Sequence, residues 1–336
     1  MDISPAISVI VPNYNHAKYL PERLESIVNQ TFKNYELIVL DDCSTDNSVE
    51  VIEAHRGKMV FRTEYNVQNS GSPFIQWVRG AKLAKADYLW IAESDDSAYP
   101  SLLEELYAVT RNHPNVGICY SQSMMMDEAG REIGIYNFIK PELGPDRWRA
   151  DYTNRGVEEV SRFLIRQNTV PNASAVLVRR DVFLDGSEGS ESMRLMGDWW
   201  TWARVMMKSD VHFLSAPLNR FRIHTSSVRA STRKATSCLE ELMVKGHICS
   251  NVTVPERIRR AAARDSLNVI WKVIEEVKHG PDRDWLNRVT DNLVKVHPKG
   301  GTWIRWLLIK RIIARMGWLK SSWRILKFQL RSAPHD

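Results

Sequence analysis

Short apolar segments alternate with amphipathic segments over the first hundred residues. Runs of β-branched and other apolar residues predict strands at 7–11, 36–40, 60–63 and 87–92. Apolar positions that recur every three or four residues predict helices at 19–30, 49–55 and 73–85. Strands that alternate with helices form crossover units, which place the strands parallel in one sheet. The pattern therefore predicts an α/β fold with a mainly parallel central sheet.

The pattern becomes less regular after residue 100 and changes again near residue 236. Further strands are predicted at 116–120, 175–178 and 211–214, with a helix at 197–208. Segment 138–154 is rich in proline, glycine and aromatic residues, and we interpret it as a long loop. The chain from residue 236 onward has the pattern of helices throughout. We therefore expect an α/β domain over residues 1–235 and a helical C-terminal region over residues 236–336.

Polar loops follow three of the predicted strands, at 13–15, 41–42 and 93–96. In parallel sheets, ligands bind beyond the carboxyl ends of the strands, where these loops lie. The third loop, Glu93-Ser94-Asp95-Asp96, gathers three carboxylates, which repel one another unless a cation offsets their charge. Such hard oxygen ligands suit Mg²⁺ or Mn²⁺. An acidic helix N-cap before Pro100 is the alternative.

Composition and charge narrow the class of protein. A hydrophobic fraction of 43% and a charged fraction of 26% are typical of a soluble globular chain. Ten basic residues and no acidic ones lie between positions 292 and 335; without those ten, 36 basic residues face 40 acidic ones. A nucleic-acid groove is therefore not expected. The four cysteines form no CxxC pair, and we find no signal peptide or transmembrane segment, so a cytoplasmic protein is expected.

Several segments together resemble the inverting glycosyltransferase family 2, which has the GT-A fold. The segments are 7–15 (ISVIVPNYN), 35–46 (YELIVLDDCSTD), 90–96 (WIAESDD), 197–199 (GDW) and 217–224 (PLNRFRIH). They occur in the family's order and spacing, over roughly residues 5–230. The resemblance implies an enzyme of the bacterial surface-polysaccharide type, with a donor-binding half at about 1–100 and an acceptor-binding half at about 101–235.

The resemblance also implies which residues bind the donor nucleotide. Pro12 and Tyr14 would line the nucleobase pocket, Asp41 would accept a hydrogen bond from the base, and Asp42 would lie on the nucleoside side. Family members often carry an Arg-Asn pair near the start of the helix before the metal strand. Here that stretch is Gln-Trp-Val-Arg-Gly, so we expect Arg79 to replace the missing donor contact.

The metal and catalytic roles follow in the same way. Asp95 matches the metal ligand, Asp96 would support the site or touch the donor sugar, and Asp198 matches the catalytic base. Glu93, which replaces the usual Asp of the motif, and His224 are further candidate metal ligands. An inverting transfer independently requires a carboxylate that takes the proton of the acceptor hydroxyl, and a metal that offsets charge on the departing diphosphate.

The remaining candidates are less specific. Trp199 and Trp200 are expected to stack on the acceptor sugar, although helical spacing also places tryptophans here in the core. Arg222 and Arg229 are candidate phosphate contacts. Gly197 stands where the family often has an acidic residue before the base. The donor is expected to be a nucleotide-diphosphate sugar, with UDP as the default and GDP and dTDP open, and the acceptor a glycan or a lipid-linked glycan.

The C-terminal segment is a basic amphipathic helix in this interpretation. Between 303 and 330, tryptophan, leucine and isoleucine alternate with cations, and four cations share one stripe: Lys320, Arg324, Lys327 and Arg331. Such helices bind anionic membrane surfaces. We therefore expect a peripheral protein at the inner face of the cytoplasmic membrane; packing of this helix on the catalytic domain or across a dimer is the alternative.

Three other functions were weighed against the transferase. A family member without catalysis, which binds a nucleotide or glycan or acts as a scaffold, would have lost Asp95, Asp96 or Asp198, and all three are present. A dinucleotide-dependent dehydrogenase would carry a G-x-G-x-x-G loop after its first strand, but residues 12–15 contain no glycine. A sugar nucleotidyltransferase would carry a glycine-rich basic loop early in the chain, which is also missing.

Overall fold

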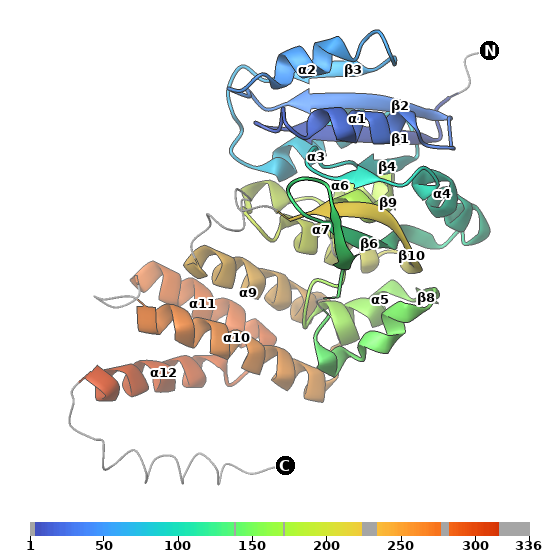
Figure 1. The fold of residues 1–336 in the computed structure, drawn as a ribbon. Coiled ribbons are helices and arrows are strands. Elements are labelled where there is room, and N and C mark those ends of the chain that lie inside the picture. Colours follow the sequence, from blue (N-terminus) through green and yellow to red (C-terminus); the bar gives the residue numbers. More distant parts are fainter. Residues whose placement is uncertain (1–3, 138, 171, 224–233, 277–281, 316–336) are drawn as a thin grey trace.

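The fold is that of a computed structural model, which describes residues 4–137, 139–170, 172–223, 234–276 and 282–315 (Figure 1). A ten-stranded sheet forms its centre. Eight strands follow the order β3-β2-β1-β4-β9-β6-β10-β5, and two lie off this path, β7 paired with β6 and β8 paired with β10. The first strands are β1 (Ile7–Asn13), β2 (Tyr35–Asp41), β3 (Arg62–Tyr65) and β4 (Tyr88–Ile91). These four strands pair only in parallel with one another, as the crossover pattern predicts.

The second half of the sheet is mixed. It contains β5 (Ser97–Ala98), β6 (Val116–Met126), β7 (Glu132–Ile135), β8 (Tyr152–Asn154), β9 (Val176–Arg179) and β10 (Asp210–Arg222). Strand β9 runs antiparallel between β4 and β6, and β10 runs parallel to β6. Consequently β1, β4, β6 and β10 all point the same way, and their carboxyl ends share one edge of the sheet.

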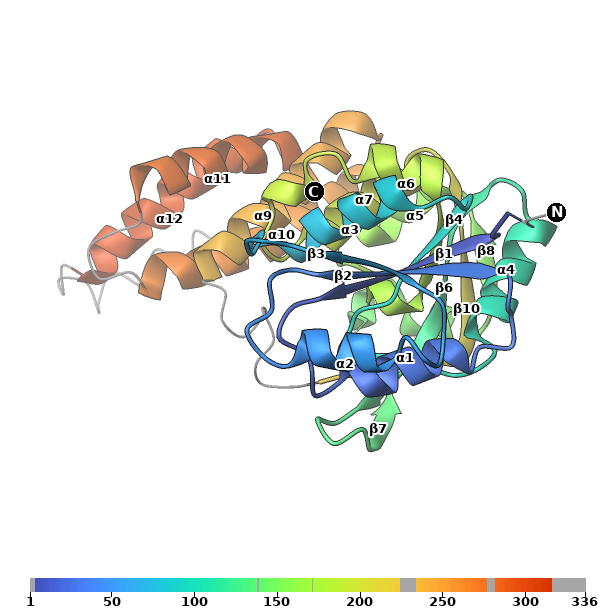
Figure 2. The same cartoon turned by 90° about the horizontal axis from the view of Figure 1, so that it is seen from above.

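Helices cover both faces of the sheet (Figure 2). One face carries α1 (Leu20–Val28), α2 (Ser48–Ala54) and α4 (Leu102–Asn112); the other carries α3 (Pro73–Leu83), α6 (Arg180–Gly186) and α7 (Gly197–Met206). Alternation along β1 explains the two layers, because Val9 and Val11 enter one core while Ile10 enters the other. Shorter turns are α5 (Gly156–Glu159), η3 (Val160–Leu164), η4 (Ala173–Ala175) and η5 (Ser190–Ser192).

Four helices follow, as predicted for the described part of the C-terminal region. They are α9 (Lys234–Asn251), α10 (Glu256–Glu276), α11 (Arg283–Val296) and α12 (Gly300–Arg315), and they pack at the end of the molecule opposite α2 and β3 (Figure 1). Their apolar side chains belong to the same hydrophobic core as α3 and α7. None of the described helices is long and apolar enough to cross a membrane. The cationic stripe at 320–331 lies outside the described residues.

Two sequence predictions differ from the structure. Segment 138–154 is not a plain loop: it holds η1 (Pro141–Leu143), η2 (Pro145–Arg149) and β8, which pairs with β10. Trp148 anchors this segment, because its buried ring donates from Nε1 to the hydroxyl of Tyr120 at 3.1 Å. The third strand begins at Arg62, and Val60, which we placed in it, is 98% exposed.

Candidate active site

Helix α3 contacts two of the three polar loops, 41–42 and 93–96, and also the segment that begins at Gly197. Gln76 Nε2 donates to Asp42 Oδ1 at 2.7 Å, and Trp77 Nε1 donates to Glu93 Oε1 at 2.7 Å. The Phe74 ring lies against Gly197, where an added Cβ would come within 2.4 Å of the ring. One helix thus contacts three segments that are far apart in the sequence. We call them by their predicted roles: the nucleoside loop (41–42), the acidic loop (93–96) and the base motif (197–199).

Asp41 and its neighbours form the first part of the predicted donor site. The buried Asp41 carboxylate accepts hydrogen bonds from Asn13 Nδ2 at 2.7 Å and from Ser44 Oγ at 2.6 Å. These bonds join the ends of β1 and β2 and fix the carboxylate. Pro12 is buried in β1, whereas Tyr14 is 44% exposed. Of the two residues predicted to line the nucleobase pocket, Tyr14 therefore has the exposed ring.

Asp42 is bound on both carboxylate oxygens by protein donors. Besides Gln76, it accepts from Asn66 Nδ2 at 2.5 Å, Asn69 Nδ2 at 3.2 Å and Ser70 Oγ at 2.7 Å. A buried carboxylate needs such partners because it has lost its water. In this structure, Asp42 organises the loop 66–72 beside the site rather than presenting a bare carboxylate to a nucleoside.

Arg79 is held at the β3 side of α3. Its guanidinium forms an ion pair with Glu64 at 2.9 Å and a hydrogen bond with the Asn66 side chain. Through Asn66 it joins the group of residues around Asp42. The structure thus gives Arg79 protein partners, and any contact with a donor would require the guanidinium to leave them.

The acidic loop has the electrostatics expected where a cation binds. Glu93 lies deep in the protein, although part of its surface reaches solvent; burial, with the charge of Asp95 as the next cause, raises its pKa to about 8. Burial and the charge of Asp95 likewise raise the pKa of Asp96 to about 7. The backbone N–H of Arg222 donates to Asp96 Oδ1 at 2.9 Å. The surroundings therefore disfavour ionised Glu93 and Asp96 next to Asp95, and a bound cation would offset that cost.

A buried cation, Arg23, lies behind this loop. Its side chain has no solvent exposure, and Nε donates to the carbonyl of Glu93 at 2.8 Å while Nη2 donates to Ser174 Oγ at 3.1 Å. Burial lowers its pKa to about 10, while the nearby charges of Asp96, Asp95 and Glu93 act in the opposite direction. We did not predict this residue from the sequence. The sequence could have indicated that this residue is buried, because Arg23 falls on the apolar stripe of α1 with Leu20, Leu24 and Ile27.

Arg222, a candidate phosphate contact from the sequence, binds protein groups in this structure. Its buried guanidinium donates to the carbonyl of Asp95 at 2.7 Å and to the carbonyls of Asp127 and Glu128 at 3.2 Å, and it forms an ion pair with Glu22. These contacts hold the acidic loop against β10. His224 and Arg229 lie outside the described residues.

The oxygen donors of this loop are chemically compatible with a divalent metal, for which the sequence predicts Asp95 as the protein ligand. No group of three or more His, Cys, Asp or Glu side chains in the described ranges is arranged to hold a metal ion. Trp77 Nε1 donates to Glu93, and the Arg222 backbone N–H donates to Asp96; the Asp95 side chain is half-buried and reaches solvent. A hard oxygen ligand in a region of excess negative charge suits Mg²⁺ or Mn²⁺ whose other ligands come from water or phosphate.

Asp198 lies in the first turn of α7 and is half-buried. Its Oδ2 accepts a hydrogen bond from Asn168 Nδ2 at 2.9 Å, and its Oδ1 accepts from the Trp199 backbone N–H at 2.7 Å. The close approach of Phe74 explains the departure at position 197, because no side chain fits between that ring and α7. Asn168, which orients the carboxylate, was missed because it lies 30 residues away in the sequence.

The prediction that Trp199 forms an acceptor platform is wrong. The side chain is 4% exposed, lies in the hydrophobic core and donates from Nε1 to the carbonyl of Leu164 at 2.9 Å, so neither ring face is open to a sugar. Trp200 is half-buried, and its ring centroid lies 4.5 Å from that of His247 on α9. Helical rotation explains the difference, because adjacent residues of α7 face different directions.

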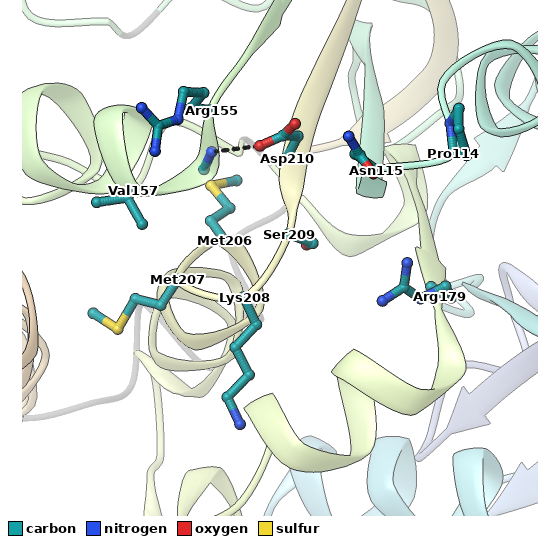
Figure 3. A pocket seen from close by; sticks show the side chains of 11 residues that line it. Pro114, Asn115, Arg155, Val157, Arg179, Met206, Met207, Lys208, Ser209 and Asp210 are labelled. Carbon is teal, nitrogen blue, oxygen red and sulfur yellow. Dashed lines mark hydrogen bonds between the residues drawn. The ribbon is translucent and has the colours of Figure 1, made fainter.

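A separate hollow lies at the edge of the sheet where β6 and β10 begin. Figure 3 shows the side chains that line it. It encloses about 400 Å³ and is lined by Arg155, Arg179, Lys208 and the amino ends of β6 and β10. Asp210, at the start of β10, accepts a hydrogen bond from the Gly156 backbone N–H at 3.4 Å. The three predicted loops follow the carboxyl ends of the parallel strands, so this hollow is not part of the candidate active site.

Comparisons with known proteins identify the family and the fold. The profile of "Glycosyl transferase family 2" matches residues 8–183, just over half of the chain. An uncharacterized glycosyltransferase of Haemophilus influenzae is 24% identical over 249 residues, which cover 71% of this chain and 77% of that protein. The Staphylococcus aureus poly(ribitol-phosphate) β-N-acetylglucosaminyltransferase TarP is 37% identical over 105 residues, which cover 30% of this chain and 32% of TarP.

Solved structures share the fold. The crystal structure of S. aureus TarS 1–349 in complex with UDP-GlcNAc has a TM-score of 0.68 and 18% identity, covering 90% of this chain and 87% of that one. The mannosyltransferase PcManGT from Pyrobaculum calidifontis, in complex with GDP-Man and Mn²⁺, has a TM-score of 0.55 and 13% identity, covering 89% and 88%. With the sheet, the acidic loop and the base motif in place, the chain belongs to glycosyl transferase family 2 and is a glycosyltransferase with the GT-A fold.

Proposed function

We propose that this enzyme transfers a sugar, with inversion, from a nucleoside-diphosphate sugar to a hydroxyl of a glycan or lipid-linked acceptor. The observation that carries the proposal is the junction at α3, where Gln76, Trp77 and Phe74 contact the nucleoside loop, the acidic loop and the start of the base motif. The TarS complexes with UDP-GlcNAc and UDP support a nucleotide-sugar donor. UDP is our default nucleotide for this chain, ahead of GDP and dTDP.

The chemistry assigned to the residues is a single displacement. Asp198, oriented by Asn168, takes the proton of the acceptor hydroxyl as that oxygen forms a bond to the anomeric carbon. The bond from the anomeric carbon to the diphosphate oxygen breaks in the same step, and the nucleoside diphosphate leaves. A divalent metal at Asp95 would offset the charge of the departing diphosphate. Tyr14 and Asp41 hold the nucleobase, and the half-buried Trp200 stays our candidate for acceptor contact.

The same proposal includes the class of acceptor and the location of the enzyme in the cell. TarP and TarS are named for transfer to poly(ribitol-phosphate), which is consistent with an acceptor that is a surface polysaccharide or its lipid-linked precursor. The basic stripe at 320–331 would place the enzyme on the inner face of the cytoplasmic membrane. The domain boundary near residue 235 belongs to this proposal as well.

Calorimetric titration tests the donor site directly. We would titrate UDP, GDP and dTDP into the full chain, each with Mn²⁺ and with EDTA, and repeat the best case with Asp95→Ala. We expect one nucleotide to bind only when both the metal and Asp95 are present. Asp146→Ala is the matched control, because its carboxylate is 79% exposed and pairs with the surface Arg149. If no nucleotide binds with metal, a non-catalytic family member becomes the better account.

A further inference from the structure

A carboxylate from the C-terminal helices binds the loop that precedes the base motif. Glu240 of α9 is 6% exposed, and its two oxygens accept hydrogen bonds from three successive backbone N–H groups. Oε1 accepts from Arg194 at 2.7 Å, and Oε2 accepts from Leu195 at 2.9 Å and from Met196 at 3.0 Å. Hydrogen bonds to an ionised carboxylate are among the stronger ones in proteins, so this contact fixes the backbone of three residues.

The contact also reaches the N-cap residue of α7. Met196 is the N-cap residue of that helix and makes no side-chain cap hydrogen bond. A methionine cannot accept the N–H groups that the first turn leaves unpaired. Glu240 supplies a carboxylate next to this end, where the helix dipole favours negative charge. Asp198 is only two residues beyond Met196, so its position depends on where this end is held.

The same loop is tied to the donor side of the site. Ser72 Oγ donates to the carbonyl of Met193 at 3.1 Å, and the Arg194 side chain donates to the carbonyl of Gly71. Both partners belong to the loop that Asp42 organises. Residues 193–196 therefore lie between the donor-side loop and α9, with hydrogen bonds to each.

A second contact from the C-terminal helices supports Asp198 from its other side. Asp265 of α10 accepts hydrogen bonds from Arg166 Nε at 2.8 Å and from Lys140 Nζ at 3.0 Å. Arg166 is two residues before Asn168, which donates to Asp198. Helices α9 and α10 thus anchor both segments that hold this carboxylate.

We infer that Glu240 is a positioning residue for Asp198, and that the C-terminal helices are part of the catalytic centre. This inference rests on the proposed role of Asp198 as the base. In physical terms, the Glu240 carboxylate fixes the backbone of residues 194–196 and thereby fixes the position of the first turn of α7. Glu240 does not touch the reacting atoms in this account.

The first test measures the loop itself, without any reaction. Hydrogen exchange of the amides of residues 194–196 would be compared between the wild-type chain and Glu240→Gln, which replaces one acceptor oxygen by an NH₂ group. We expect exchange to become at least about 10-fold faster, because the three N–H groups lose their charged acceptor. Glu275→Gln is the matched control, since Glu275 is an exposed glutamate of α10. Unchanged exchange in Glu240→Gln would overturn the inference.

The second test measures catalysis. UDP-GlcNAc with Mn²⁺ is the first probe, read as UDP release by transfer to water, and the donor that calorimetry selects replaces it if another binds. We expect Glu240→Gln to lower kcat about 10-fold or more while the Kd of the nucleotide changes less than about twofold, because only the base is misplaced. Glu240→Asp, which keeps the charge, should recover part of the rate. Equal losses of kcat and nucleotide binding would indicate a general structural role instead.

A double-mutant cycle separates this inference from the proposed function. In the Asp198→Asn background, Glu240→Gln should cause no further loss of rate, because the group that it positions is gone. A loss equal to that in the wild-type background would show that Glu240 acts independently of Asp198 and would overturn the inference. If Asp198→Asn keeps the wild-type rate, the proposed base is wrong, whereas the exchange result for residues 194–196 still stands.

Discussion

At the scale of single residues, the acidic loop depends on the buried cation behind it. Arg23 has no solvent exposure, and its guanidinium interacts with the charges of Asp96, Asp95 and Glu93. A carboxylate cluster in a protein interior needs compensation, whether from a fixed cation or from a bound ion. The fixed charge of Arg23 lets the loop fold before any metal binds.

We predict that Arg23→Met destabilises the protein by about 3 kcal/mol, because removal of one partner from a buried charge group leaves the others unpaired. Urea unfolding at neutral pH measures this loss. Arg149→Met, at a side chain that is 82% exposed, should change the free energy of unfolding by less than about 0.5 kcal/mol. Equal effects in the two variants would mean that the Arg23 charge is not required.

Residue-scale features differ in how well the sequence reveals them. Arg23 could have been found, because a charged residue on the apolar stripe of α1 signals a buried partner. The roles of Asp95 and Asp198 stay predictions, which rest on the recognisable motifs that their neighbours form. Asn168 and Glu240 could not, because their partners lie 30 and about 45 residues away, and only the tertiary fold brings them together. Trp199 was misassigned because aromatic residues serve cores and sugar platforms equally well.

At the scale of elements, periodicity predicted the first hundred residues well. The helices and strands that bury one or both faces have clear patterns, and β1, β2 and β4 occur where predicted. Strand β8 was missed, because its three residues are too few to show alternation and its pairing with β10 depends on tertiary packing. The contacts of α3 with the other segments of the site could not be predicted either, since they depend on how that helix is rotated about its axis.

The contact between α3 and α7 yields a steric prediction. Gly197→Ala should lower kcat by about 10-fold or more, because the new Cβ collides with the Phe74 ring and displaces the first turn of α7, which holds Asp198. The double variant Phe74→Leu/Gly197→Ala should regain part of the rate and stability, since the smaller side chain removes the collision. Steady-state kinetics and thermal unfolding check both. A Gly197→Ala enzyme with wild-type activity would contradict the tight contact.

The pairing of β8 with β10 yields a prediction on pH. The pKa of His212 on β10 is lowered by burial and by the neighbouring His113, and Thr153 Oγ1 lies 2.7 Å from its Nδ1. The unfolded chain therefore binds a proton more readily than the folded one, and stability should fall as pH drops below the ordinary pKa of 6.5. His212→Asn should weaken this dependence. Urea unfolding at pH 7.5 and pH 5.5 measures it, and an unchanged slope in the variant would count against His212.

At the scale of the whole molecule, the C-terminal helices and the α/β domain act as one body. They share a hydrophobic core, and α9 and α10 bind the two segments next to Asp198. The sequence predicted a helical region but gave it no catalytic part, because helical periodicity does not reveal what a helix packs against. From these contacts we infer that loss of α9 and α10 would disturb Asp198, the proposed base.

The basic stripe beyond the described residues gives the last prediction. Replacing Lys320, Arg324, Lys327 and Arg331 by glutamate in the full chain should lower binding to phosphatidylglycerol vesicles by at least about 10-fold, since each cation near anionic lipid contributes roughly 1 kcal/mol. Cosedimentation measures this, with phosphatidylcholine vesicles as the control surface. Wild-type binding should weaken as salt rises, because salt screens exposed charges. Nucleotide binding should stay unchanged. If the variant instead alters the oligomeric state and leaves vesicle binding as it was, the stripe packs on protein, and the enzyme reaches its acceptor without this segment.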